Sequence, residues 1–264
     1  MSRIAHLLRA HGWIDVATDT LEWTMQHGVV DGYVLSELAE CHLARGDVSA
    51  AEETLVRARR AGVATDAIYT SLVKAHGRLG RPEQARRMFE QARADNALTA
   101  FTYPALIAAY AAAGDLSGAR RAFEGATRDG HLSPPAFTAL ATACATVGDL
   151  DGVDRVLSMA QRAGHASGRL TLTAIRAQLD ARHFAAARRV LEDAKRRGFA
   201  DATCYVALIA ACHKAGRHRE AKRVYTSASS DERLTTDDRR RIKHAHTRTR
   251  REGAAGQRQA VMAA

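Results

Sequence analysis

Apolar side chains follow two helical stripes in the stretch from Phe101 to Gly130. The first predicted helix has its apolar residues at Tyr103, Leu106, Ile107 and Tyr110. The second has them at Ala119, Ala122, Phe123 and Ala126. Both sets follow the i, i+3, i+4, i+7 spacing of an amphipathic helix. Gly114 and Gly130 end the two segments, as glycine commonly does at a helix C-terminus, so the pattern predicts a helical hairpin.

This hairpin pattern returns with a fixed period along the whole chain. In steps of 34, the small position of the second helix is occupied by Ala17, Ala51, Ala85, Ala119, Val153, Ala187 and Ala221. The end of the first helix is occupied in the same way by Gly12, Gly46, Gly80, Gly114, Gly148, Arg182 and Gly216. A fixed period of this length indicates a repeat architecture, in which each unit buries its apolar face only against its neighbours. The sequence therefore predicts an all-α solenoid.

The period divides the chain into about seven helix-turn-helix repeats and a basic end. The predicted repeats are 1–32, 33–66, 67–100, 101–134, 135–168, 169–202 and 203–234. Repeat six is expected to be looser or distorted, because Arg182 replaces the glycine. The remainder, 235–264, is predicted to begin as a basic capping helix and to be disordered from Gly253 onward. Thr235 and Asp238 fit a loose capping box for that helix, and Ile242 is expected to close the end of the solenoid.

Alanine and proline positions support the hairpin prediction. Alanine at the small positions of the second helix lets paired helices approach closely. Pro82 is predicted to open a second helix and Pro104 to lie in the first turn of a first helix, where the missing N–H is tolerated. Pro134 and Pro135 are predicted to lie in a connection.

Composition narrows the class of protein. Four cysteines, Cys41, Cys144, Cys204 and Cys212, form no CxxC pair and are interpreted as buried thiols in a reducing compartment. No apolar run approaches the roughly 20 residues of a membrane span, so no membrane partner is expected. The formal net charge is +10, and the segment 235–264 carries eight Lys/Arg against three acids. Residues 2–12 are predicted to form the first helix of repeat one, so a targeting segment is expected to have been removed or to lie outside this sequence.

Three stretches resemble the pentatricopeptide repeat family. They are FTYPALIAAYAAAGDLSGARRAFEGATRDG, AIYTSLVKAHGRLGRPEQARRMFEQARADN and TCYVALIAACHKAGRHREAKRVY. The period of 34 and the alanines at 58, 92, 126, 160, 194 and 228 are instead similar to the tetratricopeptide relative. The resemblance implies a right-handed superhelical solenoid that binds single-stranded RNA, one base per repeat, along a face lined by the first helix of each repeat.

The same resemblance places two candidate base-facing positions in each repeat. The first gives Ser2, Ser36, Thr70, Pro104, Thr138, Leu172 and Val206, and the second gives Gly32, Asp66, Ala100, Pro134, Gly168 and Ala202. The base-facing candidates are Ser2, Ser36, Asp66, Thr70 and Thr138. Since proline, leucine and valine cannot hydrogen-bond a base edge, binding led by shape or backbone is favoured over a full sequence code.

Charged residues on the first helices are candidate phosphate contacts. These are Arg9, Lys74, Arg78, Arg176 and Lys214. The alternative is that each is a solvated edge residue. Tyr69, Tyr103, Phe137 and Tyr205 are expected to pack between helices, which leaves few aromatic side chains for stacking.

The second helices carry a larger basic stripe that recurs with the period. It comprises Arg86/Arg87, Arg120/Arg121, Arg188/Arg189, Lys195/Arg196/Arg197 and Lys222/Arg223. One interpretation is a surface for RNA backbone or for an acidic protein partner. The other is a solvated outer face, paired with acids such as Glu90, Glu124, Glu192 and Asp193.

Candidate chemistry is sparse, and the sequence predicts a protein that is not an enzyme. The twelve histidines form no HExxH motif, and neither Cys41-His42 nor Cys212-His213 has the spacing of a zinc site. Phosphate-binding glycine loops are missing as well. We therefore expect no catalytic residues, no cofactor, no metal and no small-molecule substrate.

Two functions remain open. The favoured one is non-catalytic binding of single-stranded RNA in transcript stabilisation, processing or translation, or within a ribonucleoprotein that includes protein subunits. The alternative is a tetratricopeptide-like scaffold for protein–protein interaction, with a small-residue groove from Pro104 through Ala108 and Ala111 to Thr138. The expected location is a mitochondrion or plastid if the protein is eukaryotic, and the cytoplasm if it is bacterial.

Overall fold

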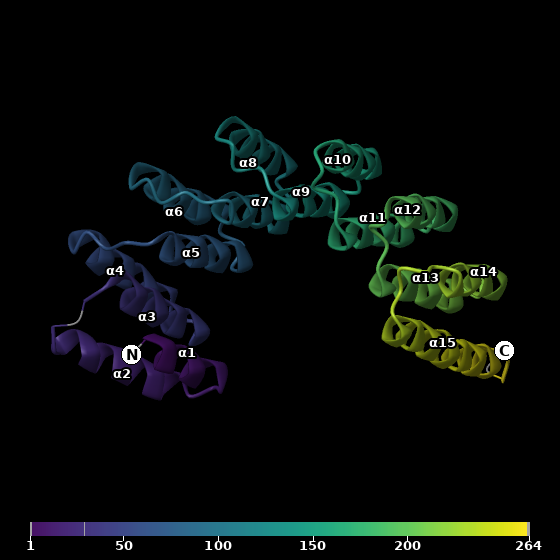
Figure 1. Cartoon of the computed structure of the whole chain (residues 1–264), viewed down its shortest axis with the longest axis horizontal. Coiled ribbons are helices and arrows are strands. Elements are labelled where there is room, and N and C mark those ends of the chain that lie inside the picture. Colours follow the sequence, from purple (N-terminus) through teal and green to yellow (C-terminus); the bar gives the residue numbers. More distant parts are fainter. Residues whose placement is uncertain (1, 29, 263–264) are drawn as a thin grey trace. The chain divides into compact units, whose positions relative to one another are not determined.

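The computed structural model describes residues 2–28 and 30–262, with side chains for 3–28 and 30–249, and the described residues form fifteen α-helices and no strand (Figure 1). The first helices of the repeats, here called A helices, are α1 (Ser2–Ala10), α3 (Gly32–Ala44), α5 (Asp66–Arg78), α7 (Thr102–Ala112), α9 (Pro134–Thr146), α11 (Gly168–Asp180) and α13 (Ala202–Lys214). The B helices are α2 (Ile14–Gln26), α4 (Val48–Arg60), α6 (Pro82–Ala94), α8 (Leu116–Arg128), α10 (Leu150–Arg162), α12 (Phe184–Arg197) and α14 (His218–Ser229). The last helix is α15 (Thr236–Met262). The prediction of an all-α repeat solenoid is therefore confirmed.

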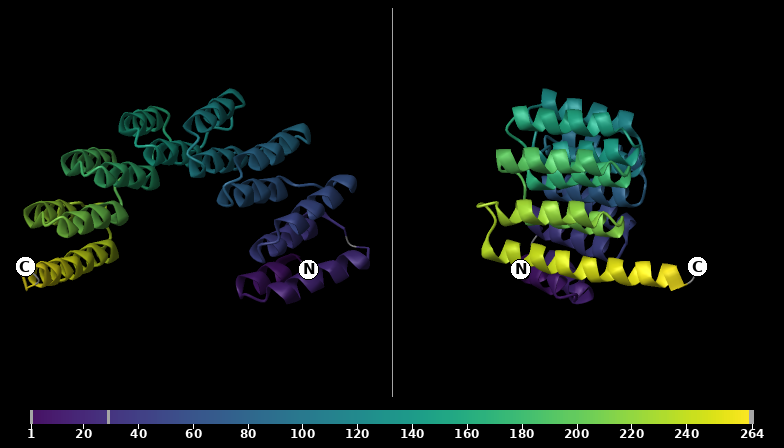
Figure 2. Two further views of the ribbon diagram at one scale, coloured as in Figure 1. Left: turned by 180° about the vertical axis from the view of Figure 1, so that it is seen from behind. Right: turned by 90° about the vertical axis from the view of Figure 1, so that its right-hand side faces the viewer.

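The contacts between helices divide the chain into two compact units, 1–143 and 144–264. In unit 1, the A helices α1, α3, α5 and α7 contact one another in order. The B helices α2, α4 and α6 each pack between two of them, as α4 does between α3 and α5, and α8 packs on α7 (Figures 1 and 2). The A helices therefore form one layer and the B helices a second. The same arrangement holds in unit 2 for α11 to α14.

Helix α15 continues the A layer of unit 2. It begins one full repeat period after α13 and contacts both α13 and α14. The capping box predicted for it is present, because the Asp238 N–H donates to Thr235 Oγ1 and the Thr235 N–H donates to Asp238 Oδ2, both at 3.1 Å. Ile242 is buried, as expected. The helix extends to Met262, past Gly253, where the sequence predicted that order would end. The division of the chain at residue 234 stays a prediction.

The small residues that recur with the period form the centre of every hairpin. Ala17, Ala51, Ala85, Ala119, Val153, Ala187 and Ala221 are all fully buried. Within the last turn of the B helices, a second alanine row at 58, 92, 126, 160, 194 and 228 is buried as well. Because a side chain larger than valine would separate the two helices, these rows set how closely A and B pack.

The backbone keeps the repeat even where glycine is missing. Gly114 and Gly148 have φ of 73° and 77°, and Arg182, at the same position in repeat six, has φ of 61°. The expectation that repeat six is distorted is therefore wrong at this turn, because its arginine adopts the left-handed conformation of the glycines. Asn96 does the same at the end of α6, with φ of 53°. A side chain in this region costs about 1–2 kcal/mol, which the surrounding helix contacts must offset.

Proline positions agree with the prediction in two cases and differ in one. Pro82 is the first residue of α6, and Pro104 lies in the first turn of α7. Helix α7 begins at Thr102, later than the register requires, because Pro104 has no N–H to bond the carbonyl of residue 100. Pro134 and Pro135 do not lie in a connection. They open α9, where the missing N–H groups would be unpaired in any case.

A tyrosine on an A helix binds an aspartate at the end of the following B helix in three repeats. The pairs are Tyr69–Asp95, Tyr103–Asp129 and Tyr205–Asp231. As expected, these tyrosine rings and that of Phe137 are buried between helices.

Arginines of the preceding B helix join two of these pairs to their neighbours. Arg59 donates to Asp95 at 2.8 and 3.1 Å, and Arg93 donates to Asp129 at 2.7 Å. Each aspartate thus ties one hairpin together and links it to the hairpin before it. The arginine and tyrosine donors hold the pKa of both carboxyls below its usual range.

We expect Arg182→Gly to stabilise the protein. The substitution removes the cost of a side chain in the left-handed region but makes the unfolded chain more flexible, so the net gain is about 0.5–1 kcal/mol. Gly148→Arg is the matched reverse change, since open space surrounds its Cβ position, and it should lose about 1 kcal/mol. Urea unfolding followed by circular dichroism measures both. A loss of stability in Arg182→Gly would contradict this account of the turn.

We expect Tyr103→Phe to change how stability depends on pH. The Tyr103 hydroxyl is the largest cause of the lowered pKa of Asp129, whose ordinary value is 3.8. A carboxyl with a lowered folded-state pKa stabilises the fold above its unfolded pKa, and this contribution is lost as pH falls through the folded pKa. The variant should therefore unfold at lower urea at pH 7, and the difference from wild type should shrink as pH falls from about 4 towards 2. A difference that is independent of pH would show that the hydroxyl does not act through Asp129.

Candidate functional site

The exposed side of the A layer in unit 1 carries four of the predicted site residues. We call it the A-helix row and define it by Tyr33, Ser36, Glu37, Glu40, Asp66, Ser71, Lys74, Arg78 and Phe101. On α3, residues 33, 37, 40 and 44 share one helical face, and residues 67, 71, 74 and 78 occupy the same positions on α5. Because α3, α5 and α7 contact one another in order, the row continues across three repeats (Figure 1).

The hydroxyl groups of the base-facing candidates are already engaged within the protein. Ser36 Oγ lies 2.7 Å from Oγ1 of Thr65, which precedes Asp66, so Ser36 and Asp66 lie close together at the junction of two repeats. Asp66 opens α5 and is half-buried. Thr70 is only 6% exposed, and its Oγ1 lies 3.2 Å from that of Thr102.

Of the other two base-facing candidates, Thr138 has a described side chain and Ser2 does not. Thr138 donates to the Pro134 carbonyl at 3.1 Å and is half-buried. The side chain of Ser2 lies outside the described residues. Base contacts by all five candidates stay predictions.

The cationic candidates of unit 1 fall into two groups. Arg9 lies 3.4 Å from Glu37 and 3.6 Å from Glu40, so its charge is compensated within the protein. Glu40 also accepts a hydrogen bond from Ser71. Lys74 and Arg78 are exposed and have no ion-pair partner among the described side chains. One helical turn separates these two cations on α5, which makes them the uncompensated positive charge of the A-helix row.

Two exposed aromatic residues lie at the N-terminal ends of the A helices on either side of α5, and the sequence pattern did not reveal them. Tyr33 is 77% exposed at the start of α3, and Phe101 is 66% exposed directly before α7. They occupy the same position of their repeats, two repeats apart, with α5 between them. Their spacing of twice the period was the available signal. The position lies outside the apolar stripe that contains Tyr69 and Tyr103, so the helix pattern does not point to it.

Unit 2 has its own exposed cations on the A helices. Arg176 of α11 and Lys214 of α13 are exposed, and neither has an ion-pair partner among the described side chains. No exposed large aromatic side chain accompanies them in the described part of unit 2. Phosphate contacts by these two residues stay predictions.

Buried groups in the protein are poor candidates for chemistry. All four cysteines are buried, as predicted, and burial raises the pKa of the Cys212 thiol to about 11, which disfavours the reactive thiolate. His213 lies 3.0 Å from both His218 and His246 but uses a different ring nitrogen for each, so the three rings form a chain. Within the described residues, no three His, Cys, Asp or Glu side chains are arranged to hold a metal ion. No described helix is long and apolar enough to cross a membrane.

The basic stripe of the B helices is partly neutralised by acids. Arg86 pairs with Glu83 at 3.0 Å, and Arg196 and Arg197 both pair with Asp193. Arg121, by contrast, is exposed without an ion-pair partner among the described side chains. The stripe is thus a mixture of the two interpretations.

Family models match individual hairpins of this chain. The model described as the PPR repeat matches residues 67–96 and 203–227, which contain α5–α6 and α13–α14. The model described as the tetratricopeptide repeat matches residues 32–57, in α3 and α4. No curated protein matches the sequence.

Solved structures share the fold at low sequence identity. The pentatricopeptide repeat protein PPR10 in complex with an 18-nt psaJ RNA element aligns with a TM-score of 0.68 and 20% identity, over 98% of this chain and 37% of that one. PPR10 from maize aligns with a TM-score of 0.59 and 20% identity, over 99% and 39%. A tetratricopeptide repeat protein from Parabacteroides merdae aligns with a TM-score of 0.56 and 13% identity, over 92% and 96%. This chain therefore spans little more than a third of the PPR10 chains it resembles.

Proposed function

Because the chain is built of pentatricopeptide-type repeats with tetratricopeptide-like features, we propose that it binds single-stranded RNA along the A-helix row without catalysing a reaction. The similarity to PPR10, which was solved with a bound RNA element, supports this proposal. The role in RNA metabolism would be to stabilise, process or help translate a transcript, alone or within a ribonucleoprotein.

One observation carries the proposal. The uncompensated cations Lys74 and Arg78 lie in the C-terminal half of α5, and the exposed rings of Tyr33 and Phe101 lie at the N-terminal ends of the A helices on either side of it. Proteins that bind single strands combine these two elements, since cations contact the phosphates and aromatic rings stack on the bases. An exposed ring of this size otherwise costs solvation energy, because its apolar surface faces water.

Base selection along the row is expected to be weak. The hydroxyls of Ser36 and Thr70 are bonded to Thr65 and Thr102, so a base edge must compete with these contacts. Ser36 and Asp66 meet at a junction whose polar groups lie at a half-exposed surface. We therefore expect affinity to come mainly from stacking and phosphate contacts.

A salt titration with labelled, mixed-sequence single-stranded RNA tests the proposal. We expect a Kd tighter than about 10 μM at low salt that weakens as salt rises, because phosphate contacts release counterions. The double variant Lys74→Gln/Arg78→Gln should reduce the slope of log K against log salt by about 1.4, which corresponds to two phosphates at about 0.7 each. Arg60→Gln/Arg87→Gln, on exposed B-helix positions, is the matched control and should leave the slope unchanged.

The aromatic contribution is tested in the same assay. Tyr33→Ala and Phe101→Ala should each weaken binding by about five- to hundredfold, the range for loss of one stacked base. Trp23→Ala removes another exposed aromatic, from the B helix α2, and serves as the control. An equal loss of RNA affinity in all three variants, or RNA binding that does not depend on salt, would contradict the proposal that the A-helix row binds RNA.

A second candidate function is a scaffold for protein partners. The tetratricopeptide match over α3 and α4 favours it. The small-residue groove predicted for it is largely closed, since Pro104 and Ala111 are buried and only Ala108 is exposed. Partners that remain bound after nuclease treatment of a pull-down would support the scaffold, whereas their loss would support RNA. The cellular compartment stays a prediction.

A further inference from the structure

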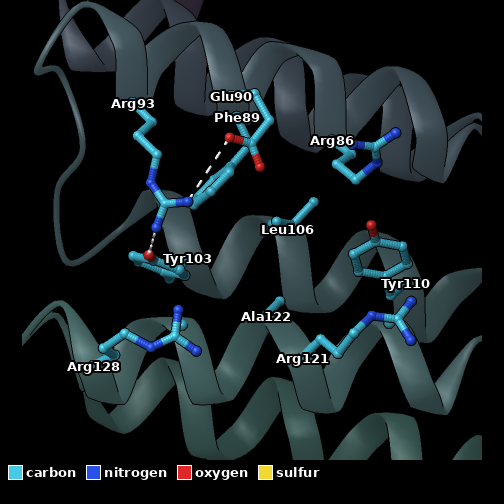
Figure 3. Close-up of a pocket in the computed structure, with 12 residues that line it drawn as sticks. Arg86, Phe89, Glu90, Arg93, Tyr103, Leu106, Tyr110, Arg121, Ala122 and Arg128 are labelled. Atoms are coloured by element: carbon cyan, nitrogen blue, oxygen red, sulfur yellow. Dashed lines mark hydrogen bonds and ion pairs between the residues drawn. The ribbon is translucent and has the colours of Figure 1, made fainter.

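The B layer of unit 1 contains a groove that the proposed RNA row does not use. It lies between α6 and α8, has α7 as its floor, and encloses about 210 Å³ (Figure 3). The buried side chains of Phe89, Tyr103, Leu106 and Tyr110 form the floor. Four arginines line the groove, Arg86 and Arg93 from α6 and Arg121 and Arg128 from α8, against one acid, Glu90. The groove therefore combines an apolar floor with a strongly basic rim.

Two glycines inside α8 create the space for this floor. A Cβ on Gly118 would lie 2.5 Å from Cδ1 of Tyr110, and a Cβ on Gly125 would lie 3.1 Å from Cε1 of Tyr103. Each glycine costs about 1 kcal/mol in a helix interior, so its presence requires a packing reason. At Gly125 the reason is the Tyr103 ring, and at Gly118 it is the Tyr110 ring together with the capping carboxylate of Asp115, which a Cβ there would also meet.

One end of the groove already holds a carboxylate. Tyr103 and Arg93 both donate to Oδ2 of Asp129, with the arginine at 2.7 Å. Arg93 also donates to the Tyr103 hydroxyl at 3.2 Å and lies over the Phe89 ring (Figure 3). The protein itself thus shows which ligand a tyrosine and an arginine bind in this groove.

The other end has the same donor types, and although Glu83 and Asp115 lie near Tyr110, no described carboxylate accepts a hydrogen bond from its hydroxyl. Tyr110 is 5% exposed, its hydroxyl has no hydrogen-bond partner among the described residues, and it points towards Arg86 (Figure 3). Arg121 of α8 lies on the opposite wall, exposed and unpaired within the described side chains. Arg86 donates to Glu83 of its own helix at 3.0 and 3.1 Å, so its charge is partly compensated. Three donors therefore converge at this end of the groove.

We propose that this groove binds an acidic segment of a partner protein. A partner carboxylate is held by Tyr110, Arg86 and Arg121, as Asp129 is held at the other end. Arg128 offers a further contact for a second acidic residue. Arginine binds carboxylates through paired hydrogen bonds, which gives the contact direction as well as charge.

A protein segment fits this groove better than RNA does. The ligand already bound by these donors is a side-chain carboxylate. The floor residues are at most 5% exposed, so a nucleobase would find no exposed ring to stack on. Tyr33 and Phe101 on the A-helix row, by contrast, are exposed. The inference is therefore independent of the proposed RNA function.

Fluorescence polarisation with the full chain tests the groove. The probe is a short labelled peptide of Glu and Leu, and its matched control has Gln in place of Glu. We expect binding of the Glu peptide to weaken at least tenfold in Arg121→Glu and about five- to tenfold in Tyr110→Phe, as for loss of a hydrogen bond to a charged group. Arg87→Glu changes the charge of α6 outside the groove and should alter the affinity less than twofold.

Further readouts separate the groove from the fold and from the RNA row. Tyr110→Phe should keep the wild-type melting temperature, because its hydroxyl has no partner among the described residues. Lys74→Gln/Arg78→Gln should retain peptide binding even where it loses RNA. Equal binding of the Gln peptide, or equal losses in Arg121→Glu and Arg87→Glu, would overturn the proposal. Loss of RNA binding in Arg121→Glu with unchanged peptide binding would also overturn it and assign the groove to RNA.

Discussion

The close approach of A and B helices at the small residues is the constraint on which the rest of the structure depends. Ala51, Ala85 and Ala119 are fully buried at the same place in successive hairpins. Because the contact recurs once in every repeat, each A helix is placed beside the next in the same register. Any larger side chain at one of these positions would shift a whole hairpin and with it every exposed residue that the hairpin carries.

The fixed register separates the molecule into two surfaces with different chemistry. The side chains of Tyr33 and Lys74 lie on the A layer, and no described helix of unit 1 covers them. On the B layer, the arginine of one hairpin reaches the aspartate of the next, as Arg93 does with Asp129. These links fix the spacing between B helices and leave a groove where the residues of α8 are small.

The sequence was sufficient for the fold because the fold is made of local periodicity. The B helices begin at the same point of every repeat, from Ile14 to His218, as the alanine row predicted. The sequence was insufficient at Pro134 and Arg182, where packing against neighbouring residues sets the backbone conformation. Proline and arginine at those places are each compatible with two local conformations, and only the packing of the hairpin selects one.

The site was less predictable than the fold. Lys74 and Arg78 were identified because exposed cations on a helix follow from the apolar pattern alone. The engagement of Ser36 by Thr65 could not be read from the sequence, because it depends on how the start of one repeat meets the next. The groove at Tyr110 was missed for a similar reason, since it requires knowing that Gly118 faces that ring.

The central claim is that a nucleic acid strand lies on the A layer of unit 1. Ultraviolet cross-linking of the protein to uniform single-stranded RNA, followed by mass spectrometry of the linked peptides, tests it most directly, since stacked aromatic residues are well placed to react. The account predicts cross-links at Tyr33 and Phe101. Cross-links confined to B-helix residues such as Trp23, with none on the A layer, would contradict it.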